Sequence, residues 1–159
     1  MSVDITLSPW DIMLAAQAGV QRQVENLSLG RKHAYGLLSN ENDWQYSIEG
    51  CLGEFALAKF LGVNWPGKNR IGAADVGDVD VRTSAHEHGA LLLHPPDPDD
   101  RPFWLLTGLN GNYVVHGWIH ARDGKLPEYW RDPTGNRPAF FVPQSKLNPA
   151  ESFEGSYLK

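Results

Sequence analysis

The sequence predicts an α+β fold in which two N-terminal helices pack on a mixed, largely antiparallel sheet. Helical patterns fill the chain up to residue 61, whereas short alternating apolar runs begin at Val76. The segment 110–112, Asn-Gly-Asn, separates two of these runs and is typical of a β-hairpin. With 159 residues and 42% hydrophobic content, the chain suits one domain with a single core. We place this domain at residues 1–150 and expect a polar tail at 151–159.

The first helix is predicted to follow Ser8. Serine is a common N-cap, Pro9 suits the first helical position, and Asp11 stands three residues after the cap. Apolar residues then recur at helical spacing from Ile12 onward. We expect this helix to end near Gly30.

The second helix is predicted from Trp44 to Leu61. The segment YSIEGCLGEFALAKFLG is too long for a strand, and Gly62 stands where a left-handed C-cap is preferred. Apolar residues occupy nearly the whole circumference of this helix. We therefore expect it to be buried.

The remaining elements are strands and loops. Five runs predict strands: DVDVRT, ALLLH, FWLLTGL, YVVHGWIHA and AFFVP. The prolines of His94–Asp100 (HPPDPDD) indicate an exposed loop, whose aspartates more often increase solubility than bind a metal. The segment PQSKL predicts one helical turn.

Composition limits the classes of partner. The net charge of −5 argues against bulk electrostatic coating of nucleic acid. However, residues 101–159 contain 7 Lys and Arg against 5 Asp and Glu, a balance of +2. Contact with DNA is therefore expected from this half, although an ordinary solvated surface explains each cation equally well; the basic residues are Arg122, Lys125, Arg131, Arg137 and Lys146.

Location and redox state follow from the absence of certain patterns. No apolar run approaches the length of a membrane span, and the N-terminus lacks a signal-peptide pattern. We expect a cytoplasmic protein without membrane contact. The single cysteine, Cys51, is expected to fill space in the core. The sequence does not predict an oligomeric state.

An acidic strand is the most unusual local feature. In an extended chain, Asp78, Asp80 and Arg82 share one face, and Val79 and Val81 share the other. The valines supply the buried face. Crowded carboxylates raise one another's pKa unless a positive group lies between them. A divalent cation such as Mg²⁺ and the side chain of Arg82 are the two candidates for that group.

The second helix adds another carboxylate. Glu54 lies on an otherwise apolar helix, and an unpaired buried carboxylate costs about 3–5 kcal/mol. Lys59 points away from it and is a poor partner. A metal ion held together with Asp75 and Asp80 would stabilise Glu54. The alternative is an ion pair with Arg82 or a hydrogen bond to a backbone amide.

The residues Glu54, Asp75, Asp80 and Arg82 resemble the site of the PD-(D/E)XK nuclease superfamily. In that family a helix acid, an aspartate, a second acid and a lysine surround Mg²⁺. The resemblance covers about Glu49–Thr83 and implies a restriction-endonuclease-like core that hydrolyses DNA phosphodiesters. It implies that Glu54, Asp75 and Asp80 are metal ligands and that Arg82 stands at the lysine position.

Two positions depart from that family pattern. Ala74 replaces its proline, and Arg82 replaces its lysine. Arginine stays charged and binds through a planar fork, so that it suits phosphate stabilisation but not proton transfer. The chain also resembles a family of small uncharacterised tailed-phage proteins in GEFALAKFLG, DVGDVDVRT, HGWIHARDGKLPEYW and AFFVPQS. That second resemblance implies no activity.

Other candidate residues have simpler interpretations. His86 and His88 flank an acid, as zinc ligands could, but a polar loop is the favoured reading. His116, Trp118 and His120 are expected to share a strand face, either to contact nucleic acid or as a half-buried sheet surface. The tryptophans are expected to anchor the core. Gln144 weakly resembles the downstream glutamine of related nucleases.

Two functions are therefore expected. The first is metal-dependent hydrolysis of DNA with Mg²⁺ or Mn²⁺, in which Arg82 steadies the phosphate. The second is a non-catalytic phage accessory protein that keeps the fold and binds a host protein or nucleic acid in the host cytoplasm. An inhibitor that mimics DNA is one version of the second.

Overall fold

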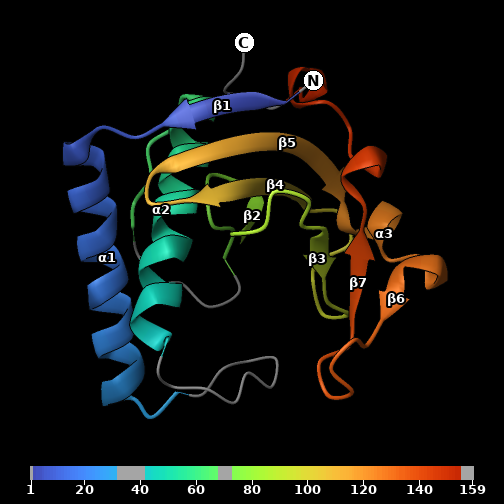
Figure 1. Cartoon of the computed structure of the whole chain (residues 1–159), viewed down its shortest axis with the longest axis horizontal. Helices are drawn as coiled ribbons and strands as arrows, with labels where there is room; N and C mark the ends of the chain where they lie inside the picture. The colour runs from blue at the N-terminus through green and yellow to red at the C-terminus, as the bar shows by residue number, and fades with distance from the viewer. Residues whose placement is uncertain (1, 32–41, 68–72, 155–159) are drawn as a thin grey trace.

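The α+β fold predicted from the sequence is confirmed by a computed structural model, which describes residues 2–31, 42–67 and 73–154 (Figure 1). Two long helices stand on one side of the molecule, and a small second sheet lies at the other (Figure 1). The elements are β1 Val3–Thr6, α1 Pro9–Ser28, α2 Asp43–Leu61, β2 Asp80–Ser84, β3 Leu91–Leu93, β4 Pro102–Leu109, β5 Asn112–His120, α3 Ala121–Gly124, β6 Trp130–Arg131 and β7 Ala139–Val142. Short 3-10 turns lie at Pro127–Tyr129, Gln144–Lys146 and Ala150–Ser152.

Both predicted helices form with the expected caps. The Ser8 hydroxyl accepts a hydrogen bond from the Asp11 N–H, and the Asp11 carboxylate accepts one from the Ser8 N–H, each at 3.1 Å. Helix α2 ends at Gly62, whose φ of 71° is the left-handed conformation that glycine tolerates. The two helices pack closely at Gly19, which has no side chain. A Cβ at this position would lie only 2.5 Å from the Ile48 Cα.

The strands form two sheets rather than one. The first has the order β1-β5-β4-β2; its β4–β5 hairpin turns at Asn110 and Gly111, with φ of 57° and 92°. Strand β2 runs parallel to β4, which makes this sheet mixed. The second sheet has the order β3-β7-β6 and is antiparallel. Strands β1 and β6 were not predicted from the sequence.

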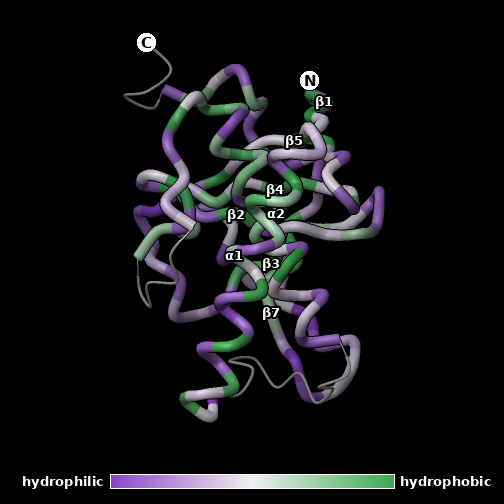
Figure 2. The backbone as a smooth tube through the Cα atoms, turned by 90° about the vertical axis from the view of Figure 1, so that its left-hand side faces the viewer, coloured by the Kyte–Doolittle hydropathy of each residue, from purple (hydrophilic) through white to green (hydrophobic). Residues whose placement is uncertain are grey.

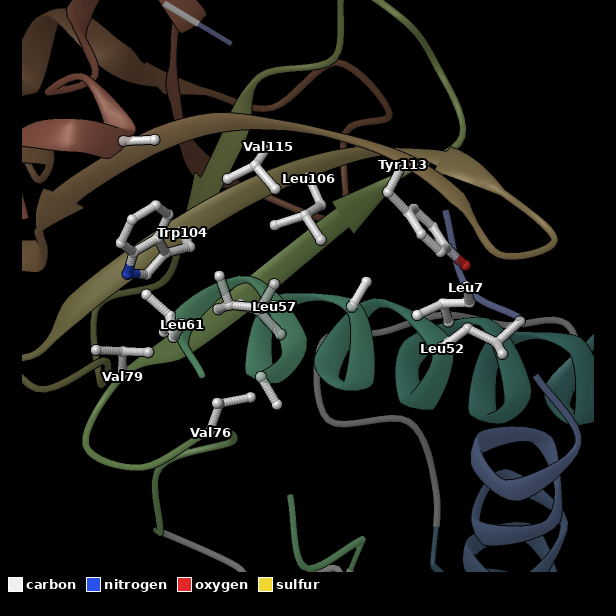
Figure 3. Packing of buried hydrophobic residues seen from close by; sticks show 14 of the residues in the cluster. Leu7, Leu52, Leu57, Leu61, Val76, Val79, Trp104, Leu106, Tyr113 and Val115 are labelled. Carbon is white, nitrogen blue, oxygen red and sulfur yellow. The ribbon is translucent and has the colours of Figure 1, made fainter. Parts of the chain in front are cut away.

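Strand β4 separates two apolar clusters. Trp104 and Leu106 face α2, where Leu57 and Leu61 pack against them together with Val115 (Figure 3). On the other face of β4, Phe103 and Leu105 pack against the second sheet, through Leu91, Leu93 and Val142. Four consecutive residues of β4, 103–106, are thus fully buried. Burial on both faces explains why this strand has an unbroken apolar sequence.

The packed chain extends beyond the predicted end of the domain at residue 150. The ring of Phe153 lies 5.1 Å, centroid to centroid, from both Trp104 and Trp118. Phe153 and Ala150 are buried, so the turn Ala150–Ser152 packs against the fold while Glu151 and Ser152 stay exposed. Residues 155–159 of the predicted tail lie outside the described residues. Within the described ranges, no helix is long and apolar enough to cross a bilayer.

Candidate functional site

A short turn brings Asp75 and Asp80 together. The backbones of Val76 and Val79 exchange hydrogen bonds of 3.0 and 2.9 Å, which reverses the chain before β2. The Asp75 N–H then donates to the Asp80 carboxylate, and the Val81 N–H donates to the Asp75 carboxylate, each at 3.0 Å. The predicted proximity of these two acids is therefore observed. Asp78 lies in the turn and is exposed, not on a strand face as expected.

Glu54 is buried on α2 and is held by Arg22 of α1. Both carboxylate oxygens accept hydrogen bonds from the guanidinium at 2.8 Å, and the Trp65 indole N–H adds a third at 3.0 Å. The sequence predicted a metal, Arg82 or a backbone amide as the partner of Glu54. The observed partner is instead Arg22. One sequence signal was available: Arg22 follows the buried Ala15 by seven residues and therefore lies on the same helix face.

Arg101 and Arg82 each form an ion pair with an aspartate. Arg101 contacts the Asp80 carboxylate at 3.2 Å. Arg82 turns away from the acids to Asp97, at 3.1 and 3.2 Å, and donates to the Leu92 carbonyl at 3.1 Å. Its guanidinium also lies 4.8 Å from the Phe103 ring centroid. Arg82 thus forms its ion pair with Asp97, although it lines the same hollow as Glu54.

Asp97 corrects the interpretation of the proline-rich loop. Its carboxylate is buried and accepts hydrogen bonds from Arg82 and from the His94 N–H, the latter at 2.7 Å. The Lys125 ammonium donates to the carbonyls of Pro95 and Asp97 and to the Asp99 carboxylate. This loop is thus fixed to the body of the protein by two cations. Asp97 is a structural partner and not a solubilising residue.

Electrostatic crowding is greatest at Asp75. Burial, followed by the charges of Glu54 and Asp80, raises the pKa of Asp75 to about 7. The Val81 N–H and, more weakly, Arg82 act in the opposite direction. Burial lowers the pKa of Arg22, but its ion pair with Glu54 outweighs that effect and keeps it above its ordinary value.

The donor set does not fit Mg²⁺ in the arrangement observed. Glu54 and Asp80 each already bind a guanidinium, and only Asp75 lacks an arginine partner among the described residues. No group of three His, Cys, Asp or Glu side chains in the described ranges is placed to hold a metal ion. Arg22 and Arg101 supply positive charge beside Glu54 and Asp80, where the sequence predicted either a divalent cation or Arg82.

A hollow of about 430 Å³ opens beside Glu54, between α2 and β2. Its second acid, Glu49, accepts hydrogen bonds from the Asn110 N–H and the Tyr113 hydroxyl. The Thr83 hydroxyl at its wall is buried without a hydrogen-bond partner among the described residues. The two acids of this hollow are therefore engaged, whereas the Thr83 hydroxyl is not engaged by any described residue.

A second hollow, of about 300 Å³, lies on the outer face of the β3-β7-β6 sheet. Leu92, Ala139 and Phe141 form its floor, and His94 and Arg137 lie at its rim. Arg131 shares this face because it is the register partner of Ala139. Of the five basic residues predicted to contact DNA, Arg131 and Arg137 lie on this face. Lys125 instead binds the proline-rich loop. Arg122 and Lys146 are exposed outside this hollow.

The remaining candidates have structural roles. His86 and His88 lie in an exposed turn, which supports the polar-loop interpretation. Gln144 donates to the carbonyls of Glu87 and Gly89 and fastens that turn. Cys51 is buried, and burial raises the pKa of its thiol to about 12, as expected for a space-filling residue.

The predicted histidine and tryptophan face is interrupted by a β-bulge between Leu105 and Leu106. His116 contacts Thr107 at 2.6 Å, while Trp118 packs against His120 at 5.2 Å between ring centroids. The three side chains therefore do not form one continuous surface. Some tryptophans also lie outside the core, because Trp10, Trp44 and Trp130 are largely exposed.

Comparison of the chain with models of protein families, with curated proteins and with solved structures gives no match in any of the three. The resemblance to PD-(D/E)XK nucleases therefore stays a prediction from the sequence.

Proposed function

We propose that this protein binds single-stranded nucleic acid, without cleaving it, on the outer face of the β3-β7-β6 sheet. The observation that supports this most directly is the hollow of about 300 Å³, which combines an apolar floor with an arginine at its rim. A cytoplasmic location, as predicted from the sequence, is part of this proposal.

The floor of the hollow suits a nucleobase. Phe141 is half-buried, so that part of its ring remains available for stacking, and Leu92 lies beside it as its register partner. Base–aromatic stacking contributes about 1–3 kcal/mol for each base. A base in a duplex already stacks on its neighbours, whereas an unpaired base can enter a hollow at low cost. This favours single strands over duplexes.

The rim of the hollow suits phosphate. The Arg137 guanidinium forms no hydrogen bond or ion pair with the described residues, although its backbone N–H donates to Asp132 at 3.1 Å. Burial lowers the pKa of His94; the charge of Asp97 acts in the opposite direction, and those of Arg82 and Arg137 add to the lowering. Arg137 thus brings a positive charge to the hollow itself, and Arg131 adds a second on the same sheet face.

Fluorescence anisotropy with labelled oligo(dT) across a salt series tests this proposal. Two phosphate contacts predict a slope of log K against log[salt] of about −1.4, because each contact contributes about −0.7 on single strands. Arg137→Gln is expected to weaken binding and to reduce the slope by about 0.7. The control is Arg122→Gln, which removes an exposed arginine outside the hollow. Absence of binding at low salt, or equal losses in both variants, would refute the proposal.

Metal-dependent phosphodiester hydrolysis is the second candidate. The raised pKa of Asp75 supports it. Three carboxyl groups lie close together here, and the two arginines paired with Glu54 and Asp80 do not neutralise all of their negative charge. Incubation of plasmid and single-stranded DNA with Mg²⁺ or Mn²⁺ tests it, with Asp80→Ala as the inactive variant. Cleavage that is lost in this variant would place hydrolysis ahead of simple binding.

A further inference from the structure

We infer that α1 is a dimerisation helix, whose outward face pairs with the same face of a second copy of this chain. This inference goes beyond nucleic-acid binding and does not depend on it. It starts from the position of α1 at the edge of the molecule, where α2 separates it from the sheet (Figure 1).

The inner and outer faces of α1 differ in packing. Ala15, Gly19 and Gln23 are buried, and Gly19 touches the backbone of α2. The opposite face is apolar yet exposed: 63% of the surface of Trp10 and 62% of that of Leu27 remain accessible. In a view onto this side, hydrophobic segments recur along α1 (Figure 2). The other exposed apolar residues on this face are Met13, Leu14, Val20 and Val24.

The spacing of the exposed residues is that of a coiled-coil seam. Positions 10, 13, 17, 20, 24 and 27 are separated by 3, 4, 3, 4 and 3 residues, which is the heptad a/d pattern. Five of the six are apolar, and the sixth is Gln17 near the middle of the seam. A helix that only covers its own core needs no such second stripe facing solvent. The pattern therefore indicates that another helix packs here.

The charges of α1 favour a second copy over a different partner. Coiled coils that select another protein do so through charges beside the seam. Here the flanking positions are uncharged: Leu14, Ala16, Gln21 and Ser28, together with Gln23, which is buried and accepts a hydrogen bond from Ser47 of α2. Of the three charged residues of α1, Asp11 and Arg22 lie on the other side of the helix and bind Lys59 and Glu54, and Glu25 is exposed but stands outside the seam and its flanking positions.

The seam is also compatible with its own copy. Its intervals read the same in both directions, so all six positions align around a two-fold axis whether the helices are parallel or antiparallel. A lipid surface is a poorer fit, because helices that lie on membranes carry Lys and Arg along the polar border. The only arginine within α1, Arg22, is turned inward to Glu54.

Sedimentation equilibrium of the full chain from about 1 to 200 μM tests the inference. The expected mass at high concentration is twice the chain mass of 17.7 kDa. Leu27→Glu, on the seam, is expected to raise the dissociation constant at least 30-fold. Leu29→Glu is the matched control, because Leu29 is equally exposed at 64% but lies off the seam. It should dimerise like the wild type.

Both substitutions replace a largely exposed leucine, so the core keeps its packing, and far-UV circular dichroism checks that α1 stays helical. Val24→Glu provides a second seam variant with the same expected result. A wild-type chain that stays at 17.7 kDa throughout the range would overturn the inference and would leave another protein as the occupant of the seam. Equal dissociation of the Leu27 and Leu29 variants would also overturn it.

Discussion

Replacement of Asp75 by asparagine should change how stability depends on pH. The asparagine side-chain oxygen can still accept the hydrogen bond from the Val81 N–H, so the variant removes mainly the charge. Between its ordinary pKa of 3.8 and its folded pKa of about 7, Asp75 is protonated in the folded chain and ionised in the unfolded one. Its contribution to stability is therefore full below pH 3.8 and is lost as the pH rises through 7.

The size of this effect follows from the same two values. At 1.36 kcal/mol per pH unit, ionising Asp75 in the folded state costs up to about 4 kcal/mol above pH 7. The variant has no such cost. Relative to the wild type, Asp75→Asn should therefore gain about 2–3 kcal/mol in free energy of unfolding between pH 5 and pH 8.

Urea unfolding at pH 5, 6, 7 and 8, with a chelator present, measures this gain. Asp4→Asn is the control, since Asp4 is exposed on β1 and should follow the wild type at every pH. A difference between the Asp75 variant and the wild type that stays constant from pH 5 to pH 8 would refute the reasoning. Repeating the series with millimolar Mg²⁺ also bears on hydrolysis, because an ion bound by Asp75 would stabilise only the wild type at pH 8.

Two further substitutions test the packing around the acidic cluster by urea unfolding. Arg22→Met leaves the Glu54 carboxylate buried without its cation and should cost about 3–5 kcal/mol, most of which Glu54→Gln should restore in the double variant. Gly53→Ala should cost about 1–3 kcal/mol, because its Cβ would lie 2.1 Å from the Thr83 hydroxyl oxygen. Gly50→Ala is its control: nothing lies within 4 Å, so this exchange in the same helix should be stabilising. This explanation requires that Gly53→Ala lowers the free energy of unfolding and that Gly50→Ala raises it.

Elements with local signals were predicted well from the sequence. The first helix begins with a capping box, which depends only on Ser8 and Asp11, and the second ends at Gly62 through its own left-handed backbone. The hairpin turn likewise depends on adjacent residues. By contrast, the division of the strands into two sheets was not predicted: the runs that form β3 and β7 were expected as strands, but β6 has only two residues and shows no readable periodicity.

The charged site was predicted only in part, because its partners are distant in sequence. Asp75 and Asp80 are five residues apart, and their proximity follows from a single turn. The partner of Glu54 stands 32 residues away on another helix. The partner of Arg82, Asp97, lies 15 residues further along the chain, in a segment whose prolines indicated only a loop. Such pairings depend on tertiary packing and leave no local pattern.

Strand β4 has a consequence for how the molecule opens. Phe103 and Leu105 belong to one apolar cluster and Trp104 and Leu106 to the other, so neither cluster can be exposed to water without disturbing the strand they share. Both halves should therefore melt in a single cooperative step. The amide protons of β4 should then exchange with solvent only when the whole chain unfolds, and hydrogen exchange measured by NMR would report the total stability at this strand.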